Sequence, residues 1–170
     1  SAIQLITAVS AIANEGQLMA PFVVQGITNS QGRIVKSFHP RKVRQVITKE
    51  NAMHLKKMMQ MVVEPGGTGV KAAEGSFSVG GKTGTAQKVG KNGTYAKGKY
   101  IASFVGFAPI EKPKIAVLFV VDEPKKKHYG GTVAAPAFRK ITQETLSYLN
   151  ITPENKTDTL TARLENGAAG

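Results

Sequence analysis

The chain has 170 residues, no cysteine, and a formal net charge of +12 that comes from 23 basic and 11 acidic side chains. The lack of cysteine excludes a disulfide scaffold, a thiolate zinc site and a cysteine nucleophile. A basic excess favours an anionic partner, but no nucleic-acid-binding signature accompanies it, so we expect no nucleic-acid partner.

The N-terminal quarter predicts a helix followed by a β-hairpin. Apolar side chains recur at helical spacing over residues 2–14, and Gly16 stands where a left-handed C-terminal cap is expected. Two β-like runs, 21–27 and 33–38, are separated by the turn signal Asn-Ser-Gln-Gly at 29–32. We expect this hairpin to be peripheral.

A second helix is predicted to begin after Thr48, whose hydroxyl can cap its first turn. Glu50 complements the helix dipole there, and the Pro-Gly-Gly sequence at 65–67 ends the helix. Met58 and Met59 are interpreted as core residues of this helix.

From residue 76 the pattern changes to strands, predicted at 76–87, 100–108 and 114–122. The second strand should have two faces, one formed by Ile101, Ser103, Val105 and Phe107 and the other by Ala102, Phe104 and Gly106. The third strand is nearly all apolar, which predicts a central strand covered on both faces. The short connection at 109–113 predicts that the second and third strands pair antiparallel.

A last helix is predicted over residues 135–149, with Pro136 in its first turn. Its expected buried face consists of Phe138, Ile141, Thr145 and Leu149. Residues 151–170 are polar and predict a flexible tail after a domain that covers residues 1–150. This order of elements predicts an α+β fold with an antiparallel sheet flanked by helices.

The most informative cluster is the Gly-Gly-Lys-Thr-Gly-Thr sequence from Gly80 to Thr85. Its Gly-Lys-Thr portion is similar to the end of a phosphate-binding loop. That loop needs a glycine at position 76, which is Ser76, and it lies between a strand and a helix. We therefore interpret the cluster as a β-strand that lines a binding site.

A strand with this sequence suits an anionic peptide ligand. Thr83 and Thr85 share a face, and two hydroxyls on one face can bind a carboxylate, while the Lys82 ammonium favours the anion. Strict alternation puts Lys82 on the other face, so a twist or bend must bring its charge to the site. Gly84 removes a side chain that would block an extended peptide, and the Thr85 backbone N–H can serve as an oxyanion-hole donor.

The surroundings of this strand carry a family resemblance. Five segments contribute to it in the same order as in the family, namely 3–16, 80–88, 100–109, 115–124 and 129–138. Together they resemble the C-terminal part of the transpeptidase domain of class B penicillin-binding proteins, whose third motif is Lys-Thr-Gly. The resemblance covers residues 1–150 and leans towards the septal, cell-division branch. Within it, the glycine-rich loop at 66–69 corresponds to a connection and not to a phosphate cradle.

The chain departs from this family in one respect. None of its serines begins the nucleophile motif Ser-x-x-Lys, and the second motif, Ser-x-Asn, is also absent. Because Ser1 opens directly into a predicted helix, we expect both motifs to precede it in a longer protein. The chain alone is then expected to be inactive, and its uncovered apolar surface predicts self-association.

The resemblance implies a partial β-lactamase/D,D-transpeptidase-like fold. It implies a peptidoglycan D,D-transpeptidase that cross-links stem peptides through an acyl-serine intermediate and that β-lactams acylate. Lys82, Thr83, Gly84 and Thr85 would bind substrate, with the Thr85 N–H in the oxyanion hole, and no metal or organic cofactor is implied.

The resemblance also implies a location and partners for the longer protein. It would be anchored in the cytoplasmic membrane with this domain on the outer side, among cell-division membrane proteins. The longest apolar run of the chain itself, residues 115–121, is too short for a membrane helix, so the chain alone is expected to be soluble. Two other functions remain open, a penicillin-sensing receptor domain and a non-catalytic basic binding module.

Other polar groups give weaker signals. The histidines, which share no ligand or triad spacing, are His39, His54 and His128. Asp122 and Glu123 are adjacent at a predicted strand end, so we expect them to point to opposite sides. The three lysines at 125–127 predict a solvated turn, with an edge of the cleft or a contact to anionic glycan as the functional alternative.

Overall fold

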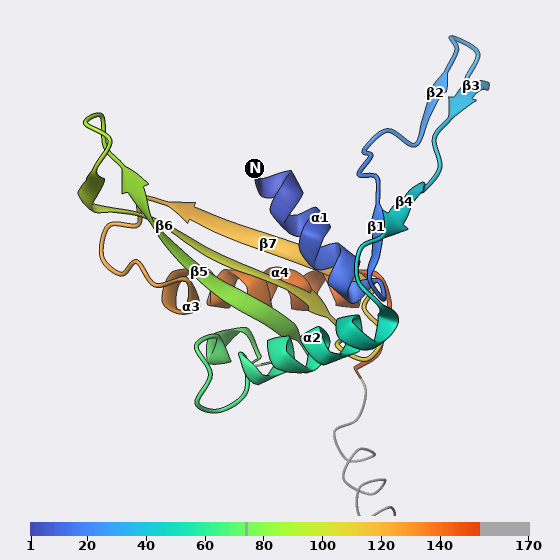
Figure 1. Ribbon diagram of the computed structural model, residues 1–170. Helices are drawn as coiled ribbons and strands as arrows, with labels where there is room; N and C mark the ends of the chain where they lie inside the picture. The colour runs from blue at the N-terminus through green and yellow to red at the C-terminus, as the bar shows by residue number, and fades with distance from the viewer. Residues whose placement is uncertain (74, 154–170) are drawn as a thin grey trace, which may run out of the picture.

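The computed structural model describes residues 1–73 and 75–153, in which a three-stranded sheet lies between helices (Figure 1). The helices are α1 (Ala2–Ala13), α2 (Lys49–Met61), the 3-10 helix η1 (Val70–Ala72), α3 (Gly130–Val133) and α4 (Ala135–Tyr148). The strands are β1 (Gln17–Met19), β2 (Gly26–Thr28), β3 (Ile34–Ser37), β4 (Lys42–Gln45), β5 (Gly80–Val89), β6 (Tyr95–Ala108) and β7 (Ile115–Asp122). In the part of the chain that is described, no helix is long and apolar enough to cross a membrane.

The main sheet has the order β5-β6-β7, and both pairs are antiparallel, as predicted for β6 and β7. The apolar strand β7, predicted to be central, lies at the edge of the sheet among the described residues, and β6 is central. The predicted covering of both faces is confirmed, whereas an apolar run does not report how many strands pair with its edges. Phe119 of β7 packs into the core on one face and Leu118 into the core on the other.

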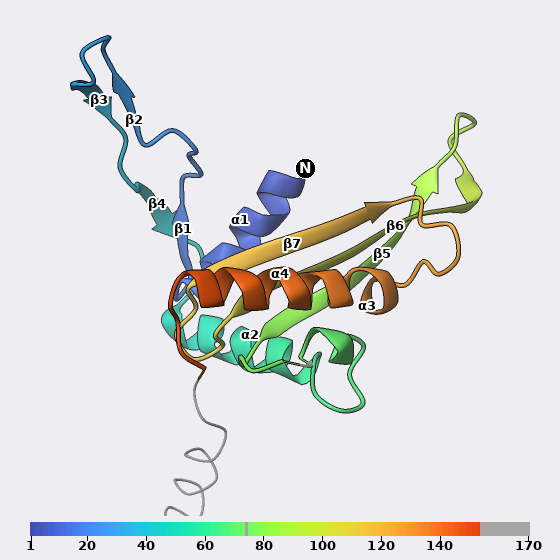
Figure 2. The same ribbon diagram turned by 180° about the vertical axis from the view of Figure 1, so that it is seen from behind.

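Two hydrophobic cores lie on opposite faces of the sheet. On one face, Phe104 of β6 meets Phe138 of α4, with ring centroids 4.7 Å apart. On the other, Phe107 packs with Val9 of α1 and Met59 of α2. Figure 2 shows α4 lying along the face away from α1. The two faces predicted for residues 101–107 are therefore confirmed.

The buried stripe of α4 differs from the predicted one. It consists of Ala135, Phe138, Thr142 and Leu146. Ile141 and Leu149, predicted to be buried, are 39% and 46% exposed. Neighbouring positions point about 100° apart on a helix, so a stripe that contains Thr142 turns Ile141 away.

Helix α2 confirms its predicted cap, because the Asn51 N–H donates to Thr48 Oγ1 over 3.1 Å. Its two predicted core methionines behave differently. Met59 is buried, whereas Met58 is 60% exposed. Adjacent helical residues point about 100° apart, so Met58 turns away from the core that Met59 enters, and only one half of this prediction is confirmed.

The predicted hairpin forms, with shorter strands than expected, and projects away from the sheet (Figure 1). Its antiparallel strands β2 and β3 join through a turn in which Gly32 has φ +75°. A second antiparallel pair, β1 with β4, carries the hairpin and was not predicted. Gly16 has φ +83°, which confirms the left-handed cap predicted after the first helix.

The segment after α4 is described only as far as residue 153. Within it, Ile151 packs against the core beneath α4. The rest of the predicted tail, residues 154–170, lies outside the described residues.

Candidate functional site

The strand β5 carries the predicted site and runs from the core into solvent. It begins at Gly80 and not at residue 76, because Phe77 and Val79 enter the α4-side core before the strand starts. Gly80 and Gly81 are buried, whereas Lys82 and Thr85 are exposed. The four predicted site residues therefore stand on the accessible part of this strand.

The Lys82 side chain turns towards the next residue of β5, and its Nζ donates to the Thr83 carbonyl oxygen over 3.0 Å. This contact indicates that the Thr83 carbonyl points away from β6. In an antiparallel strand the N–H and C=O of one residue point to the same edge, and residues two apart repeat this direction. We infer that the backbone groups of Thr83 and Thr85 face the edge of β5 that no described strand covers.

The two threonine hydroxyls lie on one face of the sheet, because Thr83 is opposite Phe104 and Thr85 is opposite Ala102. Thr83 Oγ1 lies 3.0 Å from Thr68 Oγ1, in the glycine-rich loop before η1. Thr85 Oγ1 accepts a hydrogen bond of 3.2 Å from the Gly130 N–H at the start of α3. Sequence reasoning did not identify either partner.

Glycines allow these contacts. A Cβ added at Gly130 would collide with the main-chain oxygens of Ser103 and Gly84, so only glycine lets the start of α3 lie directly on β5. A Cβ at Gly84 would collide with the Ser103 hydroxyl, which is the end of a short, rotatable side chain. The absence of a side chain at Gly84 therefore has a packing reason in addition to the predicted room for a peptide.

An aromatic group lies two residues beyond Thr85. Tyr100, which is opposite Gln87, stacks on His128 with ring centroids 4.1 Å apart and an interplanar angle of 13°. The Tyr129 ring is 4.4 Å from that of His128. Spacing alone gave His128 no partner, because its contact is with a strand distant in sequence.

An ion-pair cluster ties β5 to the end of β7. Lys88 Nζ lies 3.0 Å from Asp122 Oδ1 and 2.9 Å from Glu123 Oε1, and Lys99 Nζ lies 3.5 Å from the same Glu123 oxygen. The prediction that the two carboxylates point apart was wrong, because Glu123 has φ +47° and leaves the extended conformation. Hydrogen bonding to Lys88 lowers the pKa of Glu123, and hydrogen bonds to Glu123 and then Asp122 raise the pKa of Lys88.

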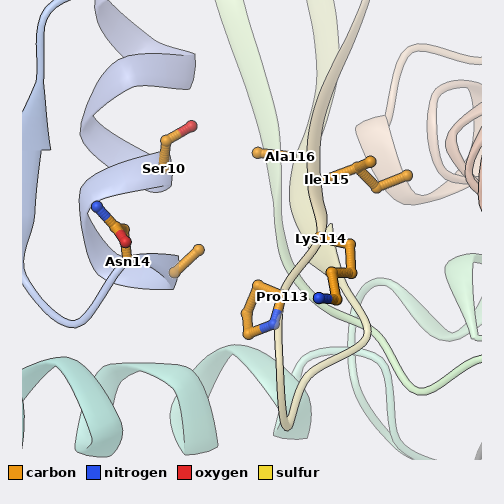
Figure 3. A pocket seen from close by; sticks show the side chains of 7 residues that line it. Ser10, Asn14, Pro113, Lys114, Ile115 and Ala116 are labelled. Carbon is orange, nitrogen blue, oxygen red and sulfur yellow. The ribbon is translucent and has the colours of Figure 1, made fainter. Parts of the chain in front are cut away.

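A small pocket of about 180 Å³ lies between the end of α1 and the start of β7 (Figure 3). Its lining includes Ser10, Asn14 and Lys114 but no residue of β5. Across residues 1–73 and 75–153, no cluster of three or more histidine, aspartate or glutamate side chains could hold a metal ion. Because the predicted site residues lie on β5, the candidate site is the open edge of this strand, and it is separate from the pocket.

Comparison with known proteins agrees with this arrangement. The family model described as the penicillin-binding protein transpeptidase domain matches residues 1–143. A protein of Neisseria meningitidis named "Probable peptidoglycan D,D-transpeptidase PenA" is 41% identical over 155 residues, which are 90% of this chain and 24% of that protein. Stage V sporulation protein D of Bacillus subtilis is 40% identical over 153 residues, or 89% of this chain and 23% of that protein.

Among solved structures, the transpeptidase domain of Burkholderia pseudomallei penicillin-binding protein 3 aligns with a TM-score of 0.74 and 38% identity, over 91% of this chain and 44% of that one. The chain spans about a quarter of the length of the two curated relatives. The predicted α+β fold of the β-lactamase-like type is confirmed. The chain belongs to the penicillin-binding protein transpeptidase family.

Proposed function

We propose that the protein containing this chain is a peptidoglycan D,D-transpeptidase that cross-links stem peptides and binds β-lactams. One observation carries the proposal: Thr85 stands on the open edge of β5 with its hydroxyl oriented by Gly130. The names of the relatives support the same activity, since PenA is described as a probable peptidoglycan D,D-transpeptidase.

The terminal carboxylate of a donor peptide, or of a penicillin, is the group that Thr83 and Thr85 would bind. A hydroxyl that accepts a hydrogen bond from Gly130 keeps its own proton, so Thr85 can donate that proton to a carboxylate oxygen. The Lys82 ammonium, bent towards the same edge, adds a favourable charge. Gly84 lets an extended peptide approach the backbone between the two threonines.

The Thr85 backbone N–H would then be one donor of the oxyanion hole. The donor-peptide carbonyl that accepts a hydrogen bond from this N–H would be polarised for attack by a serine hydroxyl. The attack forms the acyl-enzyme, and the C-terminal residue of the donor leaves through its amino group, which takes up a proton. An acceptor amine would afterwards displace the serine and form the cross-link. This scheme requires no metal and no organic cofactor.

The chain itself would supply the substrate-binding side of the site. It contains no Ser-x-x-Lys and no Ser-x-Asn, so we propose that the nucleophile and second motif belong to another part of the protein and that the isolated chain is inactive. The longer protein would be anchored in the cytoplasmic membrane, with this domain outside and cell-division membrane proteins as partners.

A fluorescent penicillin tests the proposal. The complete protein should become covalently labelled, and replacement of Thr85 by Val should slow the labelling. A penicillin-sensing receptor would be labelled equally well but would not cross-link peptidoglycan strands in vitro. A basic binding module would take no label and would bind anions in a salt-dependent way without any need for Lys82 or Thr83.

A further inference from the structure

Five lysines gather beyond the exposed end of β5, and we call them the lysine rim. They belong to the β5–β6 hairpin and to the loop between β7 and α3, and they are Lys91, Lys97, Lys125, Lys126 and Lys127. All five are exposed. Both segments lie at the same end of the sheet (Figures 1 and 2).

Contacts between the two segments hold the rim together. Tyr100 of the hairpin strand stacks on His128 of the loop, and Lys99 Nζ lies 3.5 Å from Glu123 Oε1. The two nearby carboxylates, Asp122 and Glu123, bind Lys88. Among the described residues, no carboxylate lies within 4.0 Å of a rim ammonium. A bound anionic ligand would therefore supply carboxylates to ammonium groups that have none within reach.

The direction of a bound peptide brings it to the rim. An extended chain on the open edge of β5, with its terminal carboxylate at Thr83 and Thr85, can continue in two directions. Towards Gly80 and Gly81 the strand is buried, with Ile110 and Phe104 packed against these glycines. The preceding residues of the peptide must therefore run the other way, past Val89, which is about 13 Å from Thr85 at the usual rise of a strand.

We propose that the lysine rim binds the carboxylates of the donor strand, namely those on the glycan-proximal part of the stem peptide and on neighbouring stems of the same polymer. This inference rests on the proposed function and deepens it. The lysine rim, which lies outside the Lys-Thr-Gly-Thr sequence, would then provide the specificity for a polymeric, polyanionic glycopeptide. A penicillin whose one carboxylate is bound by Thr83 and Thr85 has no further carboxylate for the rim to bind.

The test compares a polymeric with a small ligand in the complete protein. The variant carries Lys125→Gln, Lys126→Gln and Lys127→Gln. Cross-linking of uncross-linked peptidoglycan strands should fall about tenfold in kcat/KM, as the loss of three exposed charge contacts would give, and should depend less steeply on salt. The second-order rate of acylation by a fluorescent penicillin should stay within about twofold of the unaltered protein.

A matched control removes three exposed lysines from other elements, on β4, α2 and α4, through Lys42→Gln, Lys57→Gln and Lys140→Gln. This control has the same net charge as the rim variant and should cross-link normally. Equal losses of cross-linking in both variants would overturn the proposed role of the lysine rim, because they would reflect net charge alone. Unchanged cross-linking in the rim variant, or an equal loss of penicillin acylation, would also overturn it. A complete protein that never reacts with penicillin would instead contradict the proposed function.

Discussion

The Gly130 N–H donates to Thr85 Oγ1 over 3.2 Å and so joins the start of α3 to the exposed part of β5. This bond crosses 45 positions of sequence. It fixes the hydroxyl that we assign to the substrate carboxylate, and it depends on the absence of a side chain at Gly130.

Replacement of Thr85 by Val should lower the second-order rate of penicillin acylation of the complete protein about 10- to 100-fold. The substitution keeps the volume of the side chain and removes a hydrogen bond to a charged group, which contributes about 1.5–3 kcal/mol. Thr85→Ser retains the hydroxyl and should keep most of the rate. An unimpaired Thr85→Val protein would show that this hydroxyl does not bind the ligand.

Replacement of Gly130 by Ala should displace the start of α3 from β5. The added Cβ would collide with main-chain oxygens of Ser103 and Gly84, which cannot move independently of the sheet. We expect a loss of about 1–3 kcal/mol in the free energy of unfolding, together with slower acylation. Gly26→Ala on the projecting hairpin is the control and should leave acylation unchanged. Normal acylation in Gly130→Ala would mean that the bond to Thr85 is not needed.

The Lys88 cluster should stabilise the fold across a defined range of pH. The folded pKa of Lys88 is raised above its ordinary value of 10.5, so its contribution is complete below pH 10.5 and is lost as pH rises through the folded value. The folded pKa of Glu123 is lowered below 4.5, so its contribution is present above pH 4.5 and is lost as pH falls through the folded value.

Urea unfolding of the Lys88→Met variant checks this range. The difference in free energy of unfolding from the unaltered protein should be larger at pH 7 than at pH 3. Lys57→Met, on the exposed side of α2, should show no such dependence. A difference for Lys88→Met that is the same at both pH values would contradict the assignment of these ion pairs.

Two substitutions in α4 test its buried stripe. Phe138 is fully buried against Phe104, so Phe138→Ala should cost about 3–5 kcal/mol in the free energy of unfolding. Ile141 is 39% exposed, and Ile141→Ala should cost less than about 1 kcal/mol. Denaturant unfolding measures both, and a cost for Ile141→Ala as large as that for Phe138→Ala would support the stripe predicted from sequence.

Self-association of the isolated chain remains a prediction. Ile3 and Leu5 of α1 are 53% and 43% exposed, and β5 and β7 each have one edge that no described strand covers. Sedimentation of the 170-residue chain should therefore show an average mass that rises with concentration. Ile3→Ser with Leu5→Ser should reduce this rise, and a monomer at all concentrations would refute the prediction.

The sequence predicted those features of the fold that depend on local patterns. Alternation gave the two faces of β6, and the hydroxyl of Thr48 gave the start of α2. Local patterns were less informative where the same residues fit two different arrangements. An apolar run could not show that β7 pairs only with β6 among the described residues. Ile141 fitted a helical stripe that shares Phe138 with the packed stripe but is rotated from it.

The site was predictable as a strand but not as an arrangement of contacts. The motif and its neighbours identified Lys82 to Thr85, because residue types and spacing are visible in one segment. The partners of the threonines are Thr68, in a loop 15 positions away, and Gly130, at the start of α3 and 45 positions away. No local pattern predicts which distant segment will meet a strand. The convergence of Asp122 and Glu123 on Lys88 required a left-handed φ at a non-glycine residue, which sequence rarely reveals.

Covalent labelling by a fluorescent penicillin tests the central claim most directly, when the complete protein and the isolated 170-residue chain are compared under denaturing conditions. We expect a labelled band for the complete protein, a weaker one at equal time for its Thr85→Val variant, and none for the isolated chain. A labelled band from the isolated chain, or labelling of the complete protein that does not depend on Thr85, would contradict the role assigned to β5.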